Sequence, residues 1–348
     1  MRSEFAANLR RLSVPGGRLS GTPNAEAAER FVADQARSYG LRNVRFEPFE
    51  MECWISHETE VTLLGDPPRV IAGALALGKT ISTPLEGVTA EVVSVGEGRE
   101  ADFQGREAEL AGRFVLAHPD NRPRRDRVNR VLAAGAAGLL VMSGPDRPPH
   151  IGNGHESPRP EPIVAIPHDP DLLDRLQRGE RPRLNVRVRA DNWVGHPRNV
   201  VAEIPGRGPP AGEVVIVSAH LDSWHLGEGA IDNGNGAAVI LEAARALART
   251  GWQPRRTVRF VWFAGEELGL RGSTAYVQAH QAELGQVVVV INVDMPGSPR
   301  SIGRIGECPQ VEPLLQQAVA DLAGYELDPQ IGVSTGCLLY TSPSPRDS

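Results

Sequence analysis

Four clusters in the second half of the chain carry side chains that can bind metal ions. Each is a short polar run with an imidazole or a carboxylate, and they are His220-Leu221-Asp222, Asp232-Asn233-Gly234, Glu266-Glu267 and Asn292-Val293-Asp294. Imidazole nitrogens and carboxylate oxygens are ordinary zinc ligands. One aspartate can bridge two ions because it has two oxygens, and ions roughly 3.5–4 Å apart can share a water and polarise a carbonyl. The clusters therefore predict a paired-metal hydrolytic site centred on Asp232.

Glu266 and Asp222 are predicted to act beside the metal ligands. An activated water needs a proton acceptor, and Glu266 is adjacent to a candidate ligand, Glu267. Asp222 follows His220 by two residues, and its carboxylate can accept the second imidazole N–H and fix the tautomer. Taken singly, the clusters also suit a strand-end loop, an Asn-Gly turn, carboxylates at a helix N-terminus or a helix cap. Their occurrence together, in order and at strand ends, favours the metal site.

The elements that must position these clusters alternate between strands and helices. Apolar runs predict strands at 199–204, 213–219, 257–264 and 286–293, and helical spacing predicts helices at 235–248 and 273–284. Continuous apolar runs suit strands that are buried on both faces. The alternation indicates an α/β fold, with a mostly parallel mixed sheet flanked by helices. Ligands of such sheets bind beyond the carboxyl ends of the strands, which is where the four clusters lie.

The first half of the chain has a different pattern. Two amphipathic helices are predicted at 4–12 and 25–39, followed by a strand at 44–54. Short β runs then dominate to about residue 190, at 87–95, 113–117, 138–143, 163–166 and 184–188. One helix is predicted at 128–134, and the Pro- and Gly-rich stretch 144–162 is predicted to be an exposed loop.

Composition excludes several classes of protein. The 348 residues are 41% hydrophobic with a net charge of -6, so the chain can bury a large core and has no electrostatic case for nucleic acid. Three separated cysteines form neither a disulfide framework nor a cysteine metal site. No apolar stretch is long enough to predict a membrane span, and the N-terminus lacks the apolar core of a signal peptide. We expect a cytoplasmic protein if Met1 is the true start; oligomeric state cannot be read.

The stretch from His220 to Asp294 resembles the M28 family of zinc metallopeptidases. The run 220–224 with Gly229-Ala230-Ile231-Asp232 is especially similar to its plasma glutamate carboxypeptidase-like branch, and 260–273, FVWFAGEELGLRGS, matches the second family motif. This resemblance implies two Zn²⁺ ions. It implies that His220 and Asp294 bind one zinc, Glu267 the other and Asp232 both, with Glu266 as general base. Family relatives are often secreted or periplasmic.

The middle of the chain resembles a protease-associated (PA) domain inserted in such enzymes. The matching segments are 87–96, 110–116 and 133–138, which are rich in small residues. The resemblance implies that 1–72 and 191–336 form the zinc peptidase domain, and that 73–190 form the inserted domain.

The C-terminus departs from the family pattern. The family completes its second zinc with a histidine in a Ser-Asp-His run, shortly after a stretch like Gly332–Gly336, but no histidine follows His280 here. Residues 337–348 have neither helical nor strand periodicity. We expect these residues to be a non-native tail on an incomplete peptidase domain. A natural, divergent C-terminus is the alternative.

The function expected from these features is zinc-dependent exopeptidase activity on peptide substrates, with an aminopeptidase favoured. A carboxypeptidase or dipeptidase of the same family is the first alternative. A non-catalytic interaction protein on the same scaffold is the second, and would follow if the last metal ligand is truly absent. A single-zinc acyl transferase of the glutaminyl cyclase kind shares the fold, but a PA insertion is not expected there.

Overall fold

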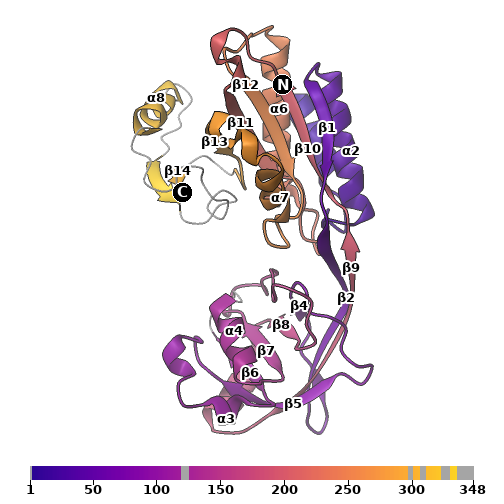
Figure 1. Ribbon diagram of the computed structural model, residues 1–348. Helices are drawn as coiled ribbons and strands as arrows, with labels where there is room; N and C mark the ends of the chain where they lie inside the picture. Colours follow the sequence, from indigo (N-terminus) through magenta and orange to yellow (C-terminus); the bar gives the residue numbers. More distant parts are fainter. Residues whose placement is uncertain (1, 119–124, 297–300, 306–310, 323–329, 335–348) are drawn as a thin grey trace. The chain divides into compact units, whose positions relative to one another are not determined.

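The computed structural model describes residues 2–118, 125–296, 301–305, 311–322 and 330–334. The chain divides into two compact units: a first unit of Met1–Met51 with His196–Ser348, and a second unit of Glu52–Gly195. Figure 1 shows the elements of each unit. None of the described helices has the length and apolar character needed to cross a bilayer.

The first unit contains a five-stranded sheet in the order β1-β10-β12-β11-β13. Its strands are β1 (Arg42–Pro48), β10 (Arg198–Ile204), β11 (Val214–His220), β12 (Thr257–Phe263) and β13 (Val287–Asn292). β11 runs parallel to both β12 and β13, whereas β10 is antiparallel to β1 and β12. The sheet is mixed as predicted, but parallel pairing is confined to the β12-β11-β13 half, where helices connect successive strands. Antiparallel neighbours need no such crossover.

Helices cover both faces of this sheet (Figure 1). α1 (Arg2–Leu12), α2 (Pro23–Ser38) and α6 (Asn235–Arg249) bury apolar side chains against alternate residues of β10 and β12, such as Val200 and Trp262. The intervening residues, such as Val201 and Val261, face the other side with Tyr276 of α7 (Arg271–Ala279). The predicted helix 273–284 is therefore two elements, because α7 ends before His280 and a 3-10 helix, η4 (Gln281–Gln286), follows.

The second unit is built on an eight-stranded sheet in the order β3-β2-β9-β5-β6-β7-β8-β4. The strands are β2 (Met51–Leu63), β3 (Arg69–Val70), β4 (Leu75–Ala76), β5 (Val88–Ser94), β6 (Phe114–Ala117), β7 (Gly138–Met142), β8 (Ile163–Ile166) and β9 (Arg183–Gly195). The four strands from β5 to β8 pair in parallel. The unit starts earlier than residue 73, because the long strands β2 and β9 are neighbours in its sheet. The single strand predicted at 44–54 is wrong, since β1 and β2 are separate strands that belong to different sheets. The assignment of the second unit as a PA domain stays a prediction.

The short helices of the second unit are η1 (Glu100–Asp102), α3 (Glu107–Leu110), α4 (Arg125–Ala133) and α5 (Pro170–Gln177). The sequence pattern did not predict α5, although the helix begins with a clear capping signal. Asp169 caps the helix by accepting a bond of 3.0 Å from the backbone N–H of Leu172, and Pro170 occupies the first turn.

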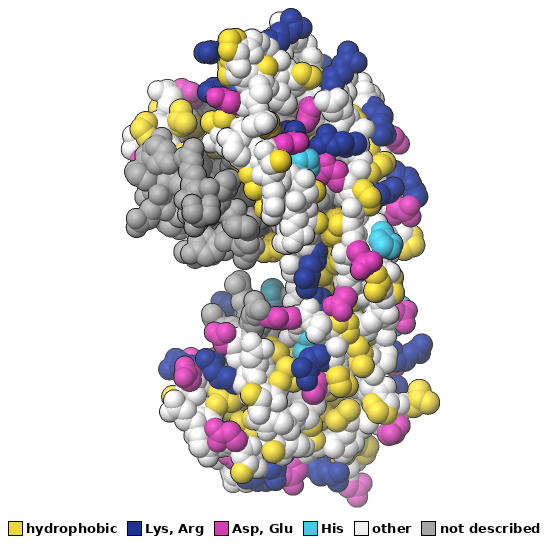
Figure 2. Space-filling model, viewed as in Figure 1, with side chains coloured by type: hydrophobic (Ala, Val, Ile, Leu, Met, Phe, Trp, Pro, Cys, Tyr) yellow, Lys and Arg dark blue, Asp and Glu magenta, His cyan; other side chains and the backbone are white. Residues whose placement is uncertain are grey.

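The remaining described elements belong to the first unit. They are η2 (Pro209–Gly212), a π-helical turn η3 (Ala230–Gly234), β14 (Ser301–Ile305), α8 (Glu312–Leu322) and β15 (Gln330–Ser334). β14 pairs in parallel with β15. The predicted non-native tail, 337–348, lies outside the described residues. On the face drawn in Figure 2, acidic and basic side chains are interspersed over the described surface.

Candidate active site

His220 is the last residue of β11, at the edge where the carboxyl ends of β11, β12 and β13 meet. Its side chain is 1% exposed. Its Nε2 atom lies 3.1 Å from Asp232 Oδ1 and 3.3 Å from Asp294 Oδ1. Two carboxylates thus converge on one imidazole nitrogen, as the sequence predicted from the strand ends.

Asp232 is placed by the π-helical turn η3, which begins after Gly229. Gly229 has a φ of 62°, and a Cβ atom there would lie 2.2 Å from Ser223 Oγ, so a side chain has no room. Within the turn, the peptide bond between Asp232 and Asn233 is cis.

Asn233 connects the Asp232 turn to the strand end that carries Asp294. It is fully buried, and its Nδ2 donates to the carbonyl of Val293 at 2.9 Å. Its Oδ1 accepts from the backbone N–H of Met295 at 3.1 Å. The sequence indicated only a turn at Asn233, because the backbone groups of Val293 and Met295 that it binds lie about sixty residues away.

Glu266 and Glu267 follow β12, and Asp222 holds their backbone. Asp222 Oδ1 accepts from the N–H of Glu266 at 3.1 Å, and Oδ2 accepts from the N–H of Glu267 at 3.3 Å. The expected bond from His220 to this carboxylate is not formed, since His220 Nδ1 lies 3.6 Å from Asp222 Oδ1 but 3.1 Å from the carbonyl oxygen of Asp222. The carbonyl is therefore the acceptor that fixes the imidazole, and the carboxylate positions the glutamate loop instead.

The site is strongly acidic. Burial opposes the charge of His220, but the surrounding carboxylates of Asp222, Asp232 and Asp294 raise its pKa well above the ordinary value. Burial, more than the neighbouring carboxylates, raises the pKa of Glu266 to about 7, against the opposing effect of His220. Burial followed by Asp222 and Asp232 also raises the pKa of Glu267 well above its usual range. So many carboxylates in one place favour a bound cation, which can replace the shared protons.

The donor set fits divalent metal ions. Two groups of side chains each bring three potential ligand atoms within 4.8 Å of one another: His220 with Asp232 and Asp294, and His220 with Glu266 and Glu267. Imidazole with carboxylates is a zinc-type donor set. The structure therefore brings together all six residues that the sequence singled out.

Sequence reasoning missed one residue next to this site. Arg18, from the segment between α1 and α2, is fully buried and donates to backbone carbonyls of the loop between His220 and Asp232. No motif marks Arg18, because its acceptors in this loop are main-chain atoms some two hundred residues along the chain.

A family model, curated relatives and solved structures all match the chain to peptidase family M28. Residues 199–330 match the model of peptidase family M28. Carboxypeptidase Q of Bos taurus is 34% identical over 299 residues, which cover 80% of this chain and 62% of that protein. The chain thus spans less than two thirds of the length of the curated relatives it matches.

Solved structures show the same fold. The crystal structure of a peptidase M28 precursor from Shewanella amazonensis gives a TM-score of 0.81 at 26% identity, covering 98% of this chain and 82% of that one. An aminopeptidase from Aneurinibacillus sp. strain AM-1 gives a TM-score of 0.68 at 26% identity, covering 88% of this chain and 73% of that one.

Proposed function

Since this chain belongs to peptidase family M28, we propose that it is a zinc-dependent exopeptidase, which removes residues from the ends of peptides. The observation that carries the proposal is the convergence of Asp232 and Asp294 on Nε2 of His220, beside the paired glutamates after β12. The sequence resemblance and the donor chemistry support the same ligand set. In this proposal His220 and Asp294 hold one zinc, Glu267 holds the second and Asp232 contacts both.

Zinc ions bound there would polarise the scissile carbonyl and lower the pKa of a water molecule. Glu266 would accept a proton from that water and pass it to the leaving amine. Glu266 is placed for both transfers, because its carboxylate lies within 4.8 Å of the ligand atoms of His220 and Glu267. Asp222 would keep Glu266 in place, since its carboxylate accepts the backbone N–H of that residue.

An aminopeptidase is the first candidate, favoured by the fold shared with an aminopeptidase from Aneurinibacillus sp. strain AM-1 at 26% identity. Arg18 is poorly suited to anchor a substrate carboxylate, because its side chain is buried and donates to four backbone carbonyls. Carboxypeptidase activity is the second candidate, favoured by the 34% identity to a protein named carboxypeptidase Q.

Tripeptides with one blocked end would separate these candidates. The full chain is incubated with free, amino-acetylated and carboxyl-amidated forms of one tripeptide, and the released amino acids are quantified. An aminopeptidase cleaves the amidated form and leaves the acetylated form intact, whereas a carboxypeptidase does the reverse. A chelator should abolish release and added zinc should restore it. Metal binding without release from any of the three would contradict the proposal and favour a non-catalytic interaction protein.

A further inference from the structure

A short buried segment of the first unit, Gly17–Ser20, contacts the loops that carry the acidic cluster. We infer that Arg18 is a positioning residue for the metal centre. Its guanidinium fixes both ends of the loop 221–229, and so fixes the spacing between His220 and Asp232. The inference rests on the proposed metal site, because it assigns a role toward the same ligands.

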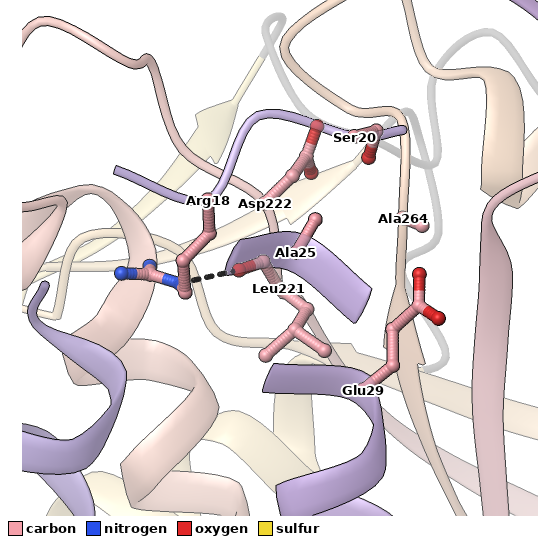
Figure 3. A pocket seen from close by; sticks show the side chains of 7 residues that line it. All are labelled: Arg18, Ser20, Ala25, Glu29, Leu221, Asp222 and Ala264. Atoms are coloured by element: carbon pink, nitrogen blue, oxygen red, sulfur yellow. Dashed lines mark hydrogen bonds between the residues drawn. The ribbon is translucent and has the colours of Figure 1, made fainter. Parts of the chain in front are cut away.

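The hydrogen bonds of Arg18 span this loop from end to end. Nε donates to the carbonyl of Leu221, directly after His220, at 3.0 Å, the dashed contact in Figure 3. Nη2 donates to the carbonyl of Gly229, where the Asp232 turn begins, at 2.9 Å. Nη1 donates to the carbonyl of Glu228 at 3.1 Å and also to that of Leu12. The guanidinium is a planar fork of N–H donors with fixed directions. It therefore sets the distance between the two loop ends, which a flexible side chain would not do.

Backbone contacts extend the link to the rest of the site. The N–H of Arg18 donates to Ser223 Oγ at 3.0 Å, and the N–H of Ser223 donates to the carbonyl of Arg18 at 3.3 Å. Ser20 Oγ accepts from the N–H of Gly265, directly before the paired glutamates, at 2.7 Å. Ser20, Asp222 and Ala264 accordingly line the same small pocket as Arg18 (Figure 3). The segment thus contacts both loops that carry the proposed ligands.

The close fit leaves little freedom in the contact. A Cβ atom on Gly17 would lie 2.0 Å from the carbonyl oxygen of Trp224, and one on Gly229 would lie 2.9 Å from Arg18 Nη1. Both glycines have positive φ, so the backbone there also favours glycine. The segment 17–20 and the loop 221–229 can therefore pack this closely only with glycine at both positions.

The charge of Arg18 argues against a purely structural role. Burial lowers the pKa of Arg18 to about 10, with an opposing contribution from Asp222, Glu267 and Asp232, so the guanidinium stays charged at neutral pH. Burying a charge is costly, and an apolar residue could fill the same space. A second arginine of the unit, Arg259, whose side chain is 11% exposed, differs because it pairs directly with a carboxylate, Glu203 Oε1, at 2.7 Å.

Cobalt binding to the full chain tests the inference without relying on activity. Arg18→Met removes the charge and the fork, and Arg18→Lys keeps the charge but loses the fork. Arg259→Met is the control, because it also removes a mostly buried, hydrogen-bonded arginine of this unit, and Arg259 contacts none of the proposed ligands. Co²⁺ is titrated into each chain below its melting temperature, and the visible absorption bands report affinity and ligand geometry.

We expect Arg18→Met to bind Co²⁺ about 10- to 100-fold more weakly than the parent chain, with altered bands, as for other residues that orient metal ligands. Arg18→Lys should fall in between, and Arg259→Met should lower the melting temperature but keep the parent affinity and bands. If Arg18→Met does not fold, Arg18→Lys and Ser223→Ala decide, since each removes only part of the link. Parent-like Co²⁺ binding in the Arg18 variants would overturn the inference and leave the proposed function standing. A parent chain that binds no Co²⁺ would overturn both.

Discussion

Both units gather the carboxyl ends of parallel strands at one edge of a sheet, but the two edges carry different side chains. In the first unit, β11, β12 and β13 lead into His220, Glu266 and Asp294. In the second unit, β6 leads into His118 and β8 into His168, whose rings lie 5.8 Å apart. Among the described residues, the groups of three or more potential metal ligands both lie in the first unit.

The histidines at these edges respond to their surroundings in opposite directions. Burial, with a smaller contribution from His168, lowers the pKa of His118. The carboxylates around His220 raise its pKa despite nearly complete burial. Parallel topology brings side chains together at both edges, but only the first edge carries the acidic residues of the proposed metal site. The predictions below follow from this difference.

Asp232→Asn should have the largest effect. The amide keeps the shape of the side chain but loses the charge and one acceptor oxygen, so it cannot bridge two ions. We expect metal affinity to fall by more than about 100-fold and peptide release to disappear, since residues that merely orient ligands already contribute 10- to 100-fold. Metal content and peptide release are measured on the purified chain. Asp34→Asn, at an exposed position of α2, is the control, and an Asp232→Asn chain with parent metal content would contradict the assignment.

Glu266→Gln should separate catalysis from metal binding. Loss of the proton acceptor should lower kcat by about 10²- to 10⁴-fold, while zinc content and KM stay close to those of the parent. Glu213→Gln, at the amino end of the sheet beside β11, provides a control with parent kcat. Parent activity in Glu266→Gln would show that another group moves the proton.

Asp222→Asn should have an intermediate effect through the glutamate loop. Asparagine replaces one carboxylate oxygen with an NH₂ donor, which would face one of the two N–H groups that Oδ1 and Oδ2 of Asp222 now accept from Glu266 and Glu267. We expect metal affinity to fall by about 10- to 100-fold. Isothermal titration with zinc measures this, and an unchanged affinity would limit Asp222 to a role in folding.

His118→Ala and His168→Ala should leave metal stoichiometry and peptide release unchanged. Within the described part of the chain, neither histidine belongs to a group of three potential metal ligands, so they make a poor zinc site compared with the acidic edge of the first unit. Zinc content by atomic spectroscopy tests both variants. A loss of bound zinc in either variant would show that the edge with His118 and His168 also binds zinc, which would contradict the difference between the two edges.

The pH response of His118 should be the smallest effect. Its folded pKa lies below the unfolded value of about 6.5, so it contributes stability that is present above pH 6.5 and is lost as the pH falls through the folded pKa. NMR titration should give a midpoint below 6.5 for His118, and His118→Asn should reduce the loss of stability in acid. A midpoint above 6.5 would contradict the opposed shifts of His118 and His220.

Sequence patterns predicted most of the first unit because its central strands are buried and apolar. β13, whose apolar run suggested burial on both faces, is instead at the end of the sheet with Val288 and Ile291 about half exposed. The strand predicted at 199–204 is β10, Arg198–Ile204, and the helix predicted at 235–248 is α6, Asn235–Arg249. Strand ends then placed the site residues, since parallel neighbours deliver them to one edge. Family membership, predicted from the same motifs, is confirmed.

Other features could not be predicted, because they depend on contacts between distant backbone groups. Arg18 binds main-chain carbonyls, and the carboxylate of Asp222 binds the N–H groups of a loop more than forty residues away. Neither pairing has a sequence signature. The break at His280 was likewise hidden, because α7 and η4 together look like one amphipathic helix.

Anomalous X-ray diffraction at the zinc edge, on crystals of the full chain grown with zinc, tests the central claim most directly. We predict a peak within bonding distance of His220 Nε2, Asp232 and Asp294, and a second peak near Glu267 that shares Asp232. Ordered side chains at this edge with no zinc peak, or zinc bound only at His118 and His168, would contradict the account.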